Sequence, residues 1–329
     1  MPLDPHLAAV LKKFDDAGRQ PAHLVPVAMS RMGYLMMTRG TLTPQQVIEV
    51  ANVQDTELGV DDRLIKARIY RPEGKGSFPT VVFFHGGGFV LGDLETHDNM
   101  CRELCRTSRV VVLAVDYRLA PEHPFPAAFN DAMAATKWAL ANTVKLGGSN
   151  VVAVAGDSAG GNLAAVVSQQ LRDEGIKLAA QFLIYPALDG SKASYPSREA
   201  NAKGYFLELE TFNWFEKQYA GMLDANADPR ITPIHASNLA GLPPALIVTA
   251  EFDPLCDEGL AYGQVLAAAG VHTEVLPCEG MIHAFFDMGR WSPRAQTHIT
   301  ECLNRFGQLL RTPIGHVSQT PGLEPAQGL

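Results

Sequence analysis

The 329-residue chain is poor in positive charge and in cysteine, and each shortage excludes a class of protein. Lysine and arginine number 27 against 35 aspartates and glutamates, which gives a net charge of −8 and leaves no basic patch. Nucleic acids and anionic membrane surfaces are themselves negative, so neither is expected as a partner. The five cysteines include no C-x-x-C pair, which favours reduced thiols over a disulfide framework.

Several other features are also missing. No apolar run is long enough to cross a membrane, so membrane insertion is not expected. The opening stretch MPLDPHLAAVLKKFDDAGRQ lacks the charged-then-apolar order of a signal peptide, which predicts a cytoplasmic protein. No internal repeat and no G-x-G-x-x-G dinucleotide loop occurs. Hydrophobic residues make up 47% of the chain, enough for a substantial globular core.

Apolar runs of strand length alternate with helical stretches along most of the chain. This alternation implies βαβ units, and therefore an α/β fold with a mostly parallel central sheet covered by helices on both faces. The strands are expected at 65–72, 80–88, 109–118, 151–155, 181–185, 245–250 and 272–276, and the helices at 127–141, 162–174 and 257–269.

A serine lies in a glycine-rich turn between a buried strand and a helix. Gly156-Asp157-Ser158-Ala159-Gly160 fits the G-x-S-x-G pattern, in which a strained strand-to-helix turn pushes the serine hydroxyl out of the sheet. Glycine-rich loops also produce this pattern by chance, and a tight turn needs glycine for backbone reasons alone. The strand expected before the turn and the helix expected after it favour a nucleophile.

A serine hydroxyl needs a base to take its proton, and the base needs an acid to fix its tautomer. On this type of turn the chain order is serine, acid, histidine. Asp253 follows one buried strand and His283 follows the next, where open α/β sheets build their sites. Asp257 and Glu258 begin a helix, where acids commonly serve the helix dipole. Asp157 is expected to brace its own loop through backbone hydrogen bonds.

The stretch His85-Gly86-Gly87-Gly88-Phe89 follows another strand. Its glycines allow backbone N–H groups to turn toward one point, as stabilisation of an oxyanion requires. A flexible linker or a phosphate loop lacking its lysine would have similar residues. Beside the serine turn, the oxyanion interpretation is favoured, and Ala159 would supply a further donor.

Six motifs occur in one order: HGGGF, DYRLAPEHPFPAA, GDSAGGN, YPALD, DPLCDEG and IHAFF. Together they resemble the hormone-sensitive lipase-like family of bacterial esterases over about residues 60–310. The resemblance implies an α/β-hydrolase fold with a helical cap, no cofactor and no metal. It implies that Ser158, Asp253 and His283 are catalytic and that Gly87, Gly88 and Ala159 form the oxyanion hole. One departure is Ala284, because the family often has glycine after the catalytic histidine.

The resemblance also implies a division of the chain. Residues 1–50 are expected to form the first part of the cap and 190–225 a second cap segment, while 51–311 form the catalytic domain. Residues 312–329 contain little apolar sequence and are expected to be disordered. Arg118 and Glu122 are expected to tie together the loops behind the oxyanion strand, and a homodimer is common in the family.

A methionine stripe at Met29, Met32 and Met36 lies in the first cap segment. Core packing is its simplest interpretation, and the alternative is that flexible thioethers line an apolar substrate pocket. On the second interpretation, Met32, Met36 and Phe89 are predicted to bind substrate.

The sequence thus predicts a serine carboxylesterase acting on small-molecule esters with short to medium acyl chains. A lipase, and an amidase or deacetylase, would use the same triad. A non-catalytic receptor of the same fold is also an alternative, but it would be expected to lack a triad member.

Overall fold

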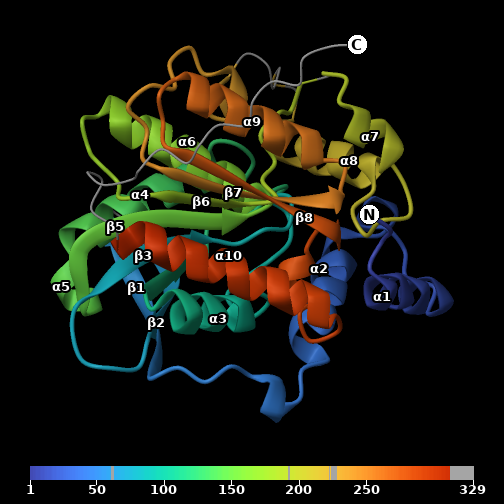
Figure 1. Ribbon diagram of the computed structural model, residues 1–329, viewed down its shortest axis with the longest axis horizontal. Helices are drawn as coiled ribbons and strands as arrows, with labels where there is room; N and C mark the ends of the chain where they lie inside the picture. Colours follow the sequence, from blue (N-terminus) through green and yellow to red (C-terminus); the bar gives the residue numbers. More distant parts are fainter. Residues whose placement is uncertain (61–62, 192, 222, 224–227, 312–329) are drawn as a thin grey trace, which may run out of the picture.

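One eight-stranded sheet runs through the part of the chain that the computed structural model describes, which is residues 1–60, 63–191, 193–221, 223 and 228–311 (Figure 1). The strand order is β1-β2-β4-β3-β5-β6-β7-β8. The strands are β1 (Asn52–Val60), β2 (Arg63–Arg71), β3 (Phe78–Phe84), β4 (Val111–Val115), β5 (Gly148–Asp157), β6 (Gln181–Ile184), β7 (Ala245–Phe252) and β8 (Thr273–Ile282). The fold is that of an α/β hydrolase, as expected.

The sheet is parallel from β4 to β8, and β1 and β2 are its antiparallel part. At its centre β3 lies between β4 and β5, with Val82 opposite Leu113 on one side and Val154 on the other. These side chains are fully buried. A strand covered on both faces can be apolar at every position, which explains why the central strands are continuous apolar runs.

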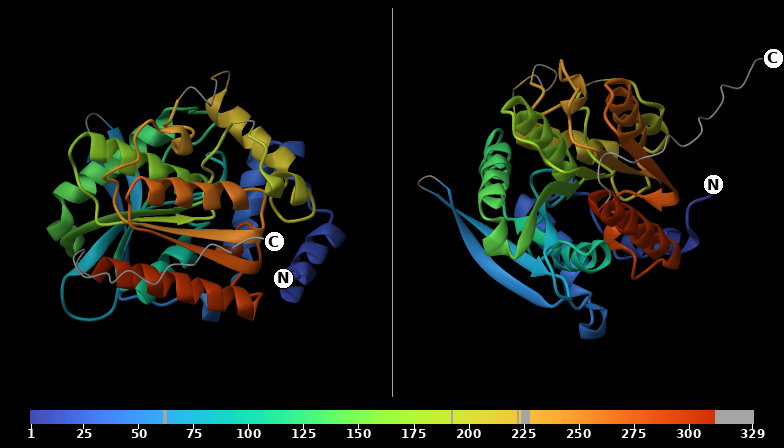
Figure 2. Two further views of the ribbon diagram at one scale, coloured as in Figure 1. Left: turned by 45° about the horizontal axis from the view of Figure 1, so that its top comes forward. Right: turned by 60° about the vertical axis from the view of Figure 1, so that its left-hand side comes forward.

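Helices cover both faces of the sheet (Figure 2). One face carries α4 (Ala127–Ala141), α5 (Thr143–Leu146), α6 (Ala159–Asp173) and α9 (Cys256–Ala268), and the other carries α3 (Asp98–Ser108) and α10 (Pro293–Arg311). Each layer buries its own apolar cluster against the strands, with Leu163 and Leu266 in one and Leu104 and Phe306 in the other.

A further group of helices lies beyond the carboxyl ends of the parallel strands, and we call it the cap (Figure 1). It contains α1 (Pro5–Asp16), α2 (Val27–Leu35), α7 (Pro196–Ala200) and α8 (Leu209–Ala220). Asp4 is the N-cap of α1, and its side chain accepts hydrogen bonds from two backbone N–H groups of the first turn. The two parts of the cap meet where His23 Nδ1 lies 2.8 Å from Thr211 Oγ1.

The differences from the expected elements have local causes. The helix at 127–141 coincides with α4, but β1 was not expected as a separate strand. It is an edge strand in which only Leu58 is buried, so its sequence NVQDTELGV gives no apolar run. None of the described helices is long and apolar enough to span a membrane. The predicted disorder of residues 312–329 concerns a segment outside the described residues.

Candidate active site

Ser158 lies at the point where β5 ends and α6 begins. Its φ of 55° and ψ of −118° are values that a non-glycine residue adopts only under strain. The flanking glycines are a steric requirement. A Cβ at Gly156 would lie 2.2 Å from the Gly160 carbonyl oxygen, and a Cβ at Gly160 would lie 1.9 Å from the Phe84 carbonyl oxygen. The turn therefore forms only because both positions lack a side chain.

Two buried side chains extend from Ser158 in one hydrogen-bonded chain. His283 Nε2 lies 2.9 Å from Ser158 Oγ, and His283 Nδ1 lies 2.6 Å from Asp253 Oδ2. The other oxygen of the Asp253 carboxylate accepts the Leu255 N–H at 2.9 Å, and the His283 ring packs against Tyr185. Asp253 is 0% exposed and His283 is 5% exposed, so both are fixed within the protein. The structure thus brings together the three residues that the sequence singled out.

The other carboxylates near Asp253 have different partners. Glu258 is fully buried and pairs with Arg198 at 2.7 Å, and burial raises the pKa of Glu258 to about 7. Asp257 accepts the backbone N–H of Ser197 at 2.8 Å. Neither carboxylate competes with Asp253 for the histidine.

Asp157 connects the serine turn to the glycine loop that follows β3. Its Oδ1 accepts the Gly86 N–H at 2.8 Å, so this carboxylate braces the glycine loop, whereas it was expected to brace its own turn. Behind the loop, His85 stacks on Tyr117 with ring centroids 4.2 Å apart. Burial lowers the pKa of His85 to about 4, so this ring is neutral and structural.

The glycine loop has a backbone that side chains would prevent. Gly87 has φ 110° and Gly88 has φ 62°, both in the region that favours glycine. A Cβ at Gly88 would lie 2.1 Å from Phe215 Cγ, so α8 packs directly on the loop. Gly87, Gly88 and Ala159 line the same cavity as Ser158. The residues predicted to donate to an oxyanion therefore surround one space.

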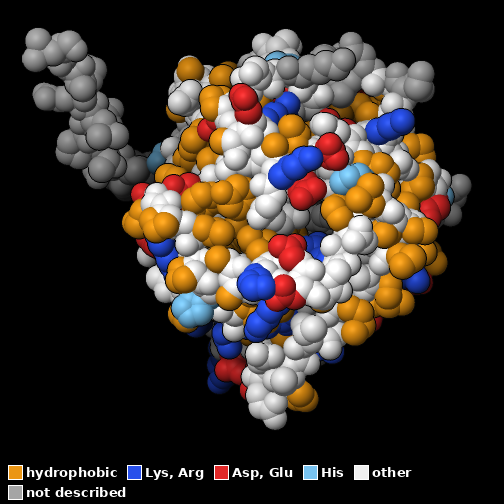
Figure 3. All heavy atoms as spheres, turned by 90° about the vertical axis from the view of Figure 1, so that its right-hand side faces the viewer, with side chains coloured by type: hydrophobic (Ala, Val, Ile, Leu, Met, Phe, Trp, Pro, Cys, Tyr) orange, Lys and Arg blue, Asp and Glu red, His pale blue; other side chains and the backbone are white. Residues whose placement is uncertain are grey.

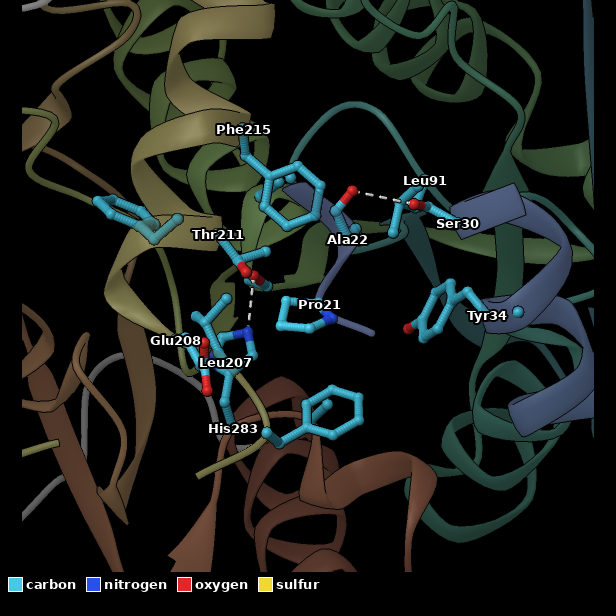
Figure 4. A pocket seen from close by; sticks show the side chains of 18 of the residues that line it. Pro21, Ala22, Ser30, Tyr34, Leu91, Leu207, Glu208, Thr211, Phe215 and His283 are labelled. Atoms are coloured by element: carbon cyan, nitrogen blue, oxygen red, sulfur yellow. Dashed lines mark hydrogen bonds between the residues drawn. The ribbon is translucent and has the colours of Figure 1, made fainter. Parts of the chain in front are cut away.

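That cavity lies beneath the cap and has a volume of about 430 Å³, within the usual range for small-molecule sites. Figure 4 shows Thr211 and Phe215 of α8 on one side of it, Tyr34 of α2 on the other, and His283 at the lower end. On the outer face of this region, apolar side chains lie beside a central group of charged ones (Figure 3).

The methionines do not face the cavity as expected. Met32 and Met36 are 59% and 52% exposed and lie outside its lining, so the prediction that they contact substrate there is wrong. Met29 and Met37 line the cavity instead, Met37 as a buried side chain and Met29 as one that is 61% exposed. Phe89 also lines it, stacked on the α8 ring of Tyr219 with centroids 3.7 Å apart.

Other polar residues have roles that the sequence did not indicate. Arg118 pairs with Asp131 of α4 at 2.8 Å, whereas Glu122 holds the cap helix α2 by accepting two hydrogen bonds from Arg31. Arg118 thus connects the segment that follows β4 to helix α4, and Glu122 anchors the cap.

Glu216 of α8 is a carboxyl group in the cavity wall that sequence reasoning missed. Burial, followed by repulsion from Glu258, raises the pKa of Glu216 to about 8. Arg198 opposes this effect but is itself paired with Glu258. The surrounding sequence NWFEKQY is typical of an ordinary amphipathic helix, so it gives no signal that this carboxyl group faces a cavity.

Ala284 follows His283 in the left-handed region, with φ 62° and ψ 20°. An L-residue is less stable there by about 1–2 kcal/mol, which is a physical reason for glycine at this position in the family. Ala284 also lines the cavity, so its methyl group takes up space beside the histidine.

A hydroxyl, an imidazole and a carboxylate in this order can supply a nucleophile, its base and the group that orients the base. The neighbouring glycine loop can supply backbone donors where negative charge develops. This geometry suits acyl transfer at a carbonyl carbon. The fold and the site together define the class of the protein as an α/β hydrolase.

Comparison with known proteins identifies a family within this class. Residues 81–287 match the family described as alpha/beta hydrolase fold. The chain is 46% identical to the carboxylic ester hydrolase LipN of Mycobacterium tuberculosis over 68% of this chain and 61% of LipN. It is 37% identical to the carboxylesterase NlhH of the same organism, over 89% of this chain and 92% of NlhH.

A solved structure gives the same result. The ester hydrolase EH1AB1 from the metagenome of Lake Arreo, complexed with a derivative of bipyridine phosphonate, superimposes with a TM-score of 0.88 at 40% identity. The match covers 94% of this chain and 100% of that one. The chain belongs to the hormone-sensitive lipase-like family of α/β hydrolases, which confirms the resemblance of its motifs, and it is a carboxylic ester hydrolase.

Proposed function

We propose that the protein hydrolyses short- to medium-chain carboxylic esters in two steps, with Ser158 as the nucleophile. The observation that supports this most strongly is the hydrogen-bonded chain from Ser158 Oγ to His283 Nε2 at 2.9 Å and from His283 Nδ1 to Asp253 Oδ2 at 2.6 Å. These distances are within the range that proton transfer from a serine hydroxyl requires.

In the first step Ser158 Oγ attacks the ester carbonyl carbon while its proton passes to His283 Nε2. The tetrahedral oxyanion accepts hydrogen bonds from the backbone N–H groups of Gly87, Gly88 and Ala159. The intermediate collapses, the C–O bond to the alcohol breaks, and His283 returns the proton to the leaving oxygen. In the second step water repeats the attack on the acyl-enzyme and releases the acid, while Asp253 stabilises each imidazolium ion.

The size of the cavity supports a preference for butanoyl and hexanoyl esters. Its volume of about 430 Å³ is shared by the acyl and alcohol parts of a substrate. Phe89 and Tyr219 form a stacked aromatic pair at its wall, and Phe215 packs on the glycine loop. A long acyl chain would have to displace these rings.

Nitrophenyl esters from acetate to palmitate test this proposal with the wild type, Ser158→Ala and Ser168→Ala. Ser168 is a matched control, because it is a buried serine of α6, the helix that follows Ser158, and its hydroxyl donates to the Ala164 carbonyl. We expect a maximum at butanoate or hexanoate, abolished by Ser158→Ala and retained in the control. A maximum at palmitate would refute the chain-length preference, and full activity in Ser158→Ala would refute the nucleophile.

The proposal extends to the state of the protein in solution. The proposed ligand is a small-molecule ester. The homodimer and the cytoplasmic location remain predictions from the sequence. Sedimentation velocity of the full chain tests the dimer, because a single species with the mass of one 35.6 kDa chain at micromolar concentration would contradict it.

A further inference from the structure

A group of polar side chains lies between the cap and the loops that carry the site. Asp157 precedes Ser158 in the chain, Asp287 follows His283 by four residues, and His97 precedes α3. Asp157 and His97 are 2% and 1% exposed. The mechanism proposed above uses none of these three groups directly, although each is attached to a segment that it does use.

Tyr34 brings the cap into this group, because it lies on α2 and lines the substrate cavity. Its hydroxyl lies 3.0 Å from Asp287 Oδ2 and 3.3 Å from His97 Nε2. The same His97 nitrogen lies 3.4 Å from Asp157 Oδ1, which holds the Gly86 N–H at 2.8 Å. One phenol group therefore contacts both the histidine behind the glycine loop and the loop that follows the catalytic base.

Thr96 fixes the position of the hydrogen on His97 Nδ1. Its hydroxyl donates to the Asp93 carbonyl at 2.9 Å, so it can only accept from His97 Nδ1, which is also 2.9 Å away. His97 Nε2 then faces the Asp157 carboxylate. Burial acts to lower the pKa of His97, but the charge and hydrogen bond of Asp157 outweigh it and raise that pKa above its ordinary value.

His97 Nε2 lies within 3.4 Å of three groups, namely the Asp157 carboxylate, the Tyr34 hydroxyl and the Gly86 N–H of the glycine loop. The Tyr34 hydroxyl donates to Asp287. The imidazole and the phenol thus lie between the carboxylates of Asp157 and Asp287 and connect them. Hydrogen bonds to charged groups of this kind are stronger than neutral ones and hold their members in a narrow range of positions.

We propose that Tyr34 is a positioning residue whose hydroxyl couples the seating of α2 over the cavity to the geometry of the oxyanion loop and of the His283 loop. Through His97 and Asp157 it fixes Gly86, and through Asp287 it fixes the segment that begins at His283. The inference rests on the proposed ester hydrolysis, because the alignment that it describes matters only when an oxyanion forms.

The seating of α2 itself does not depend on this hydroxyl alone. Arg31, on the same helix, pairs with Glu122 at 2.7 Å and donates to the carbonyl oxygens of Val90 at 2.8 Å and Ala120 at 3.0 Å. Tyr34→Phe keeps these anchors and the aromatic ring, so it removes the link to the network while leaving the helix in place.

The test compares Tyr34→Phe with Tyr70→Phe in the full-length protein. Tyr70 is a matched control, because its hydroxyl also lies 3.0 Å from an aspartate oxygen, that of Asp98, and the residue does not line the cavity. For each variant we would measure kcat and KM on nitrophenyl butanoate, the melting temperature, and the inhibition constant of an alkyl trifluoromethyl ketone. This ketone forms a tetrahedral oxyanion with the active serine and therefore reports on the oxyanion hole.

We expect Tyr34→Phe to lower kcat about tenfold and to raise the inhibition constant of the trifluoromethyl ketone by a similar factor. KM should stay within about twofold of the wild-type value, because only the charged transition state loses alignment. Tyr70→Phe should leave kcat and the inhibition constant near the wild-type values. An unchanged kcat in Tyr34→Phe, or a rise in KM alone, would overturn the proposal, since the latter would make Tyr34 a plain substrate contact.

Asp287→Asn provides a second arm if Tyr34→Phe melts well below the wild type. It keeps an oxygen to accept the Tyr34 proton but removes the charge, and we expect the same parallel loss in kcat and ketone affinity. Wild-type kcat in a folded Asp287→Asn protein would also overturn the proposal. Failure of the proposed function can be told apart from failure of this inference. If the proposed function were wrong, Ser158→Ala would keep wild-type ester turnover.

Discussion

Replacing Glu216 by glutamine should make the stability of the protein less dependent on pH. Burial raises the pKa of Glu216 from 4.5 to about 8 in the folded protein. The folded state therefore holds this proton more tightly than the unfolded chain, and wild-type stability falls as pH rises from about 4.5 to about 8. Glutamine has the shape of the protonated acid and does not titrate, so the variant avoids this loss.

The size of the effect follows from the same values. Complete conversion of the pKa difference would amount to roughly 5 kcal/mol. Glu216 is only partly buried and water screens its charge, so we expect a gain of about 1–2 kcal/mol at pH 9, or about 2–5 °C in Tm. At pH 5 the folded wild type is still protonated, and the two proteins should melt within about 1 °C of each other.

Calorimetric melting at pH 5, 7 and 9 measures this difference directly. Glu49→Gln is the matched control, because Glu49 is exposed to solvent and precedes β1, away from the cavity. The control should follow the wild type at each pH. A Glu216→Gln protein whose Tm advantage is equal at pH 5 and pH 9, or absent at both, would refute the reasoning.

Three other substitutions test separate parts of the site. Asp253→Asn should lower kcat by about 10³–10⁴ without changing the circular dichroism spectrum, because asparagine favours the wrong tautomer of His283, and a loss below tenfold would count against it. Gly88→Ala should destabilise the protein by about 1–3 kcal/mol in urea unfolding, since its Cβ would overlap Phe215, and wild-type stability would show that the loop relaxes freely. Met32→Lys should keep kcat/KM within about twofold of the wild-type value, because the Met32 side chain is 59% exposed. A tenfold loss would show that Met32 contacts the substrate after all.

The site could be predicted from sequence where the chemistry is local. The turn at Ser158 requires glycines at fixed neighbouring positions, and the sequence displays them directly. Asp253 and His283 could be chosen because each follows a buried strand, and the carboxyl ends of parallel strands meet at one edge of the sheet. The glycine loop could be placed for the same reason.

The cap could not be predicted in the same detail. Met29, Met32, Met36 and Met37 are chemically alike, so the sequence has no contrast to show which side of the helical segment faces the cavity. Tertiary packing makes that choice, and the short π-helical turn Met36–Gly40 that follows α2 changes the helical phase. Glu216 was missed for a related reason, since a charged residue on an amphipathic helix is normally exposed.

The central claim is that Ser158 is the nucleophile, and a fluorophosphonate probe tests it most directly. The purified protein would be labelled, digested and mapped by mass spectrometry while butanoate ester turnover is followed in the same sample. The geometry predicts one modified peptide, with the label on Ser158, and a loss of turnover in proportion to labelling. A folded sample that turns over ester while Ser158 stays unlabelled would contradict the account.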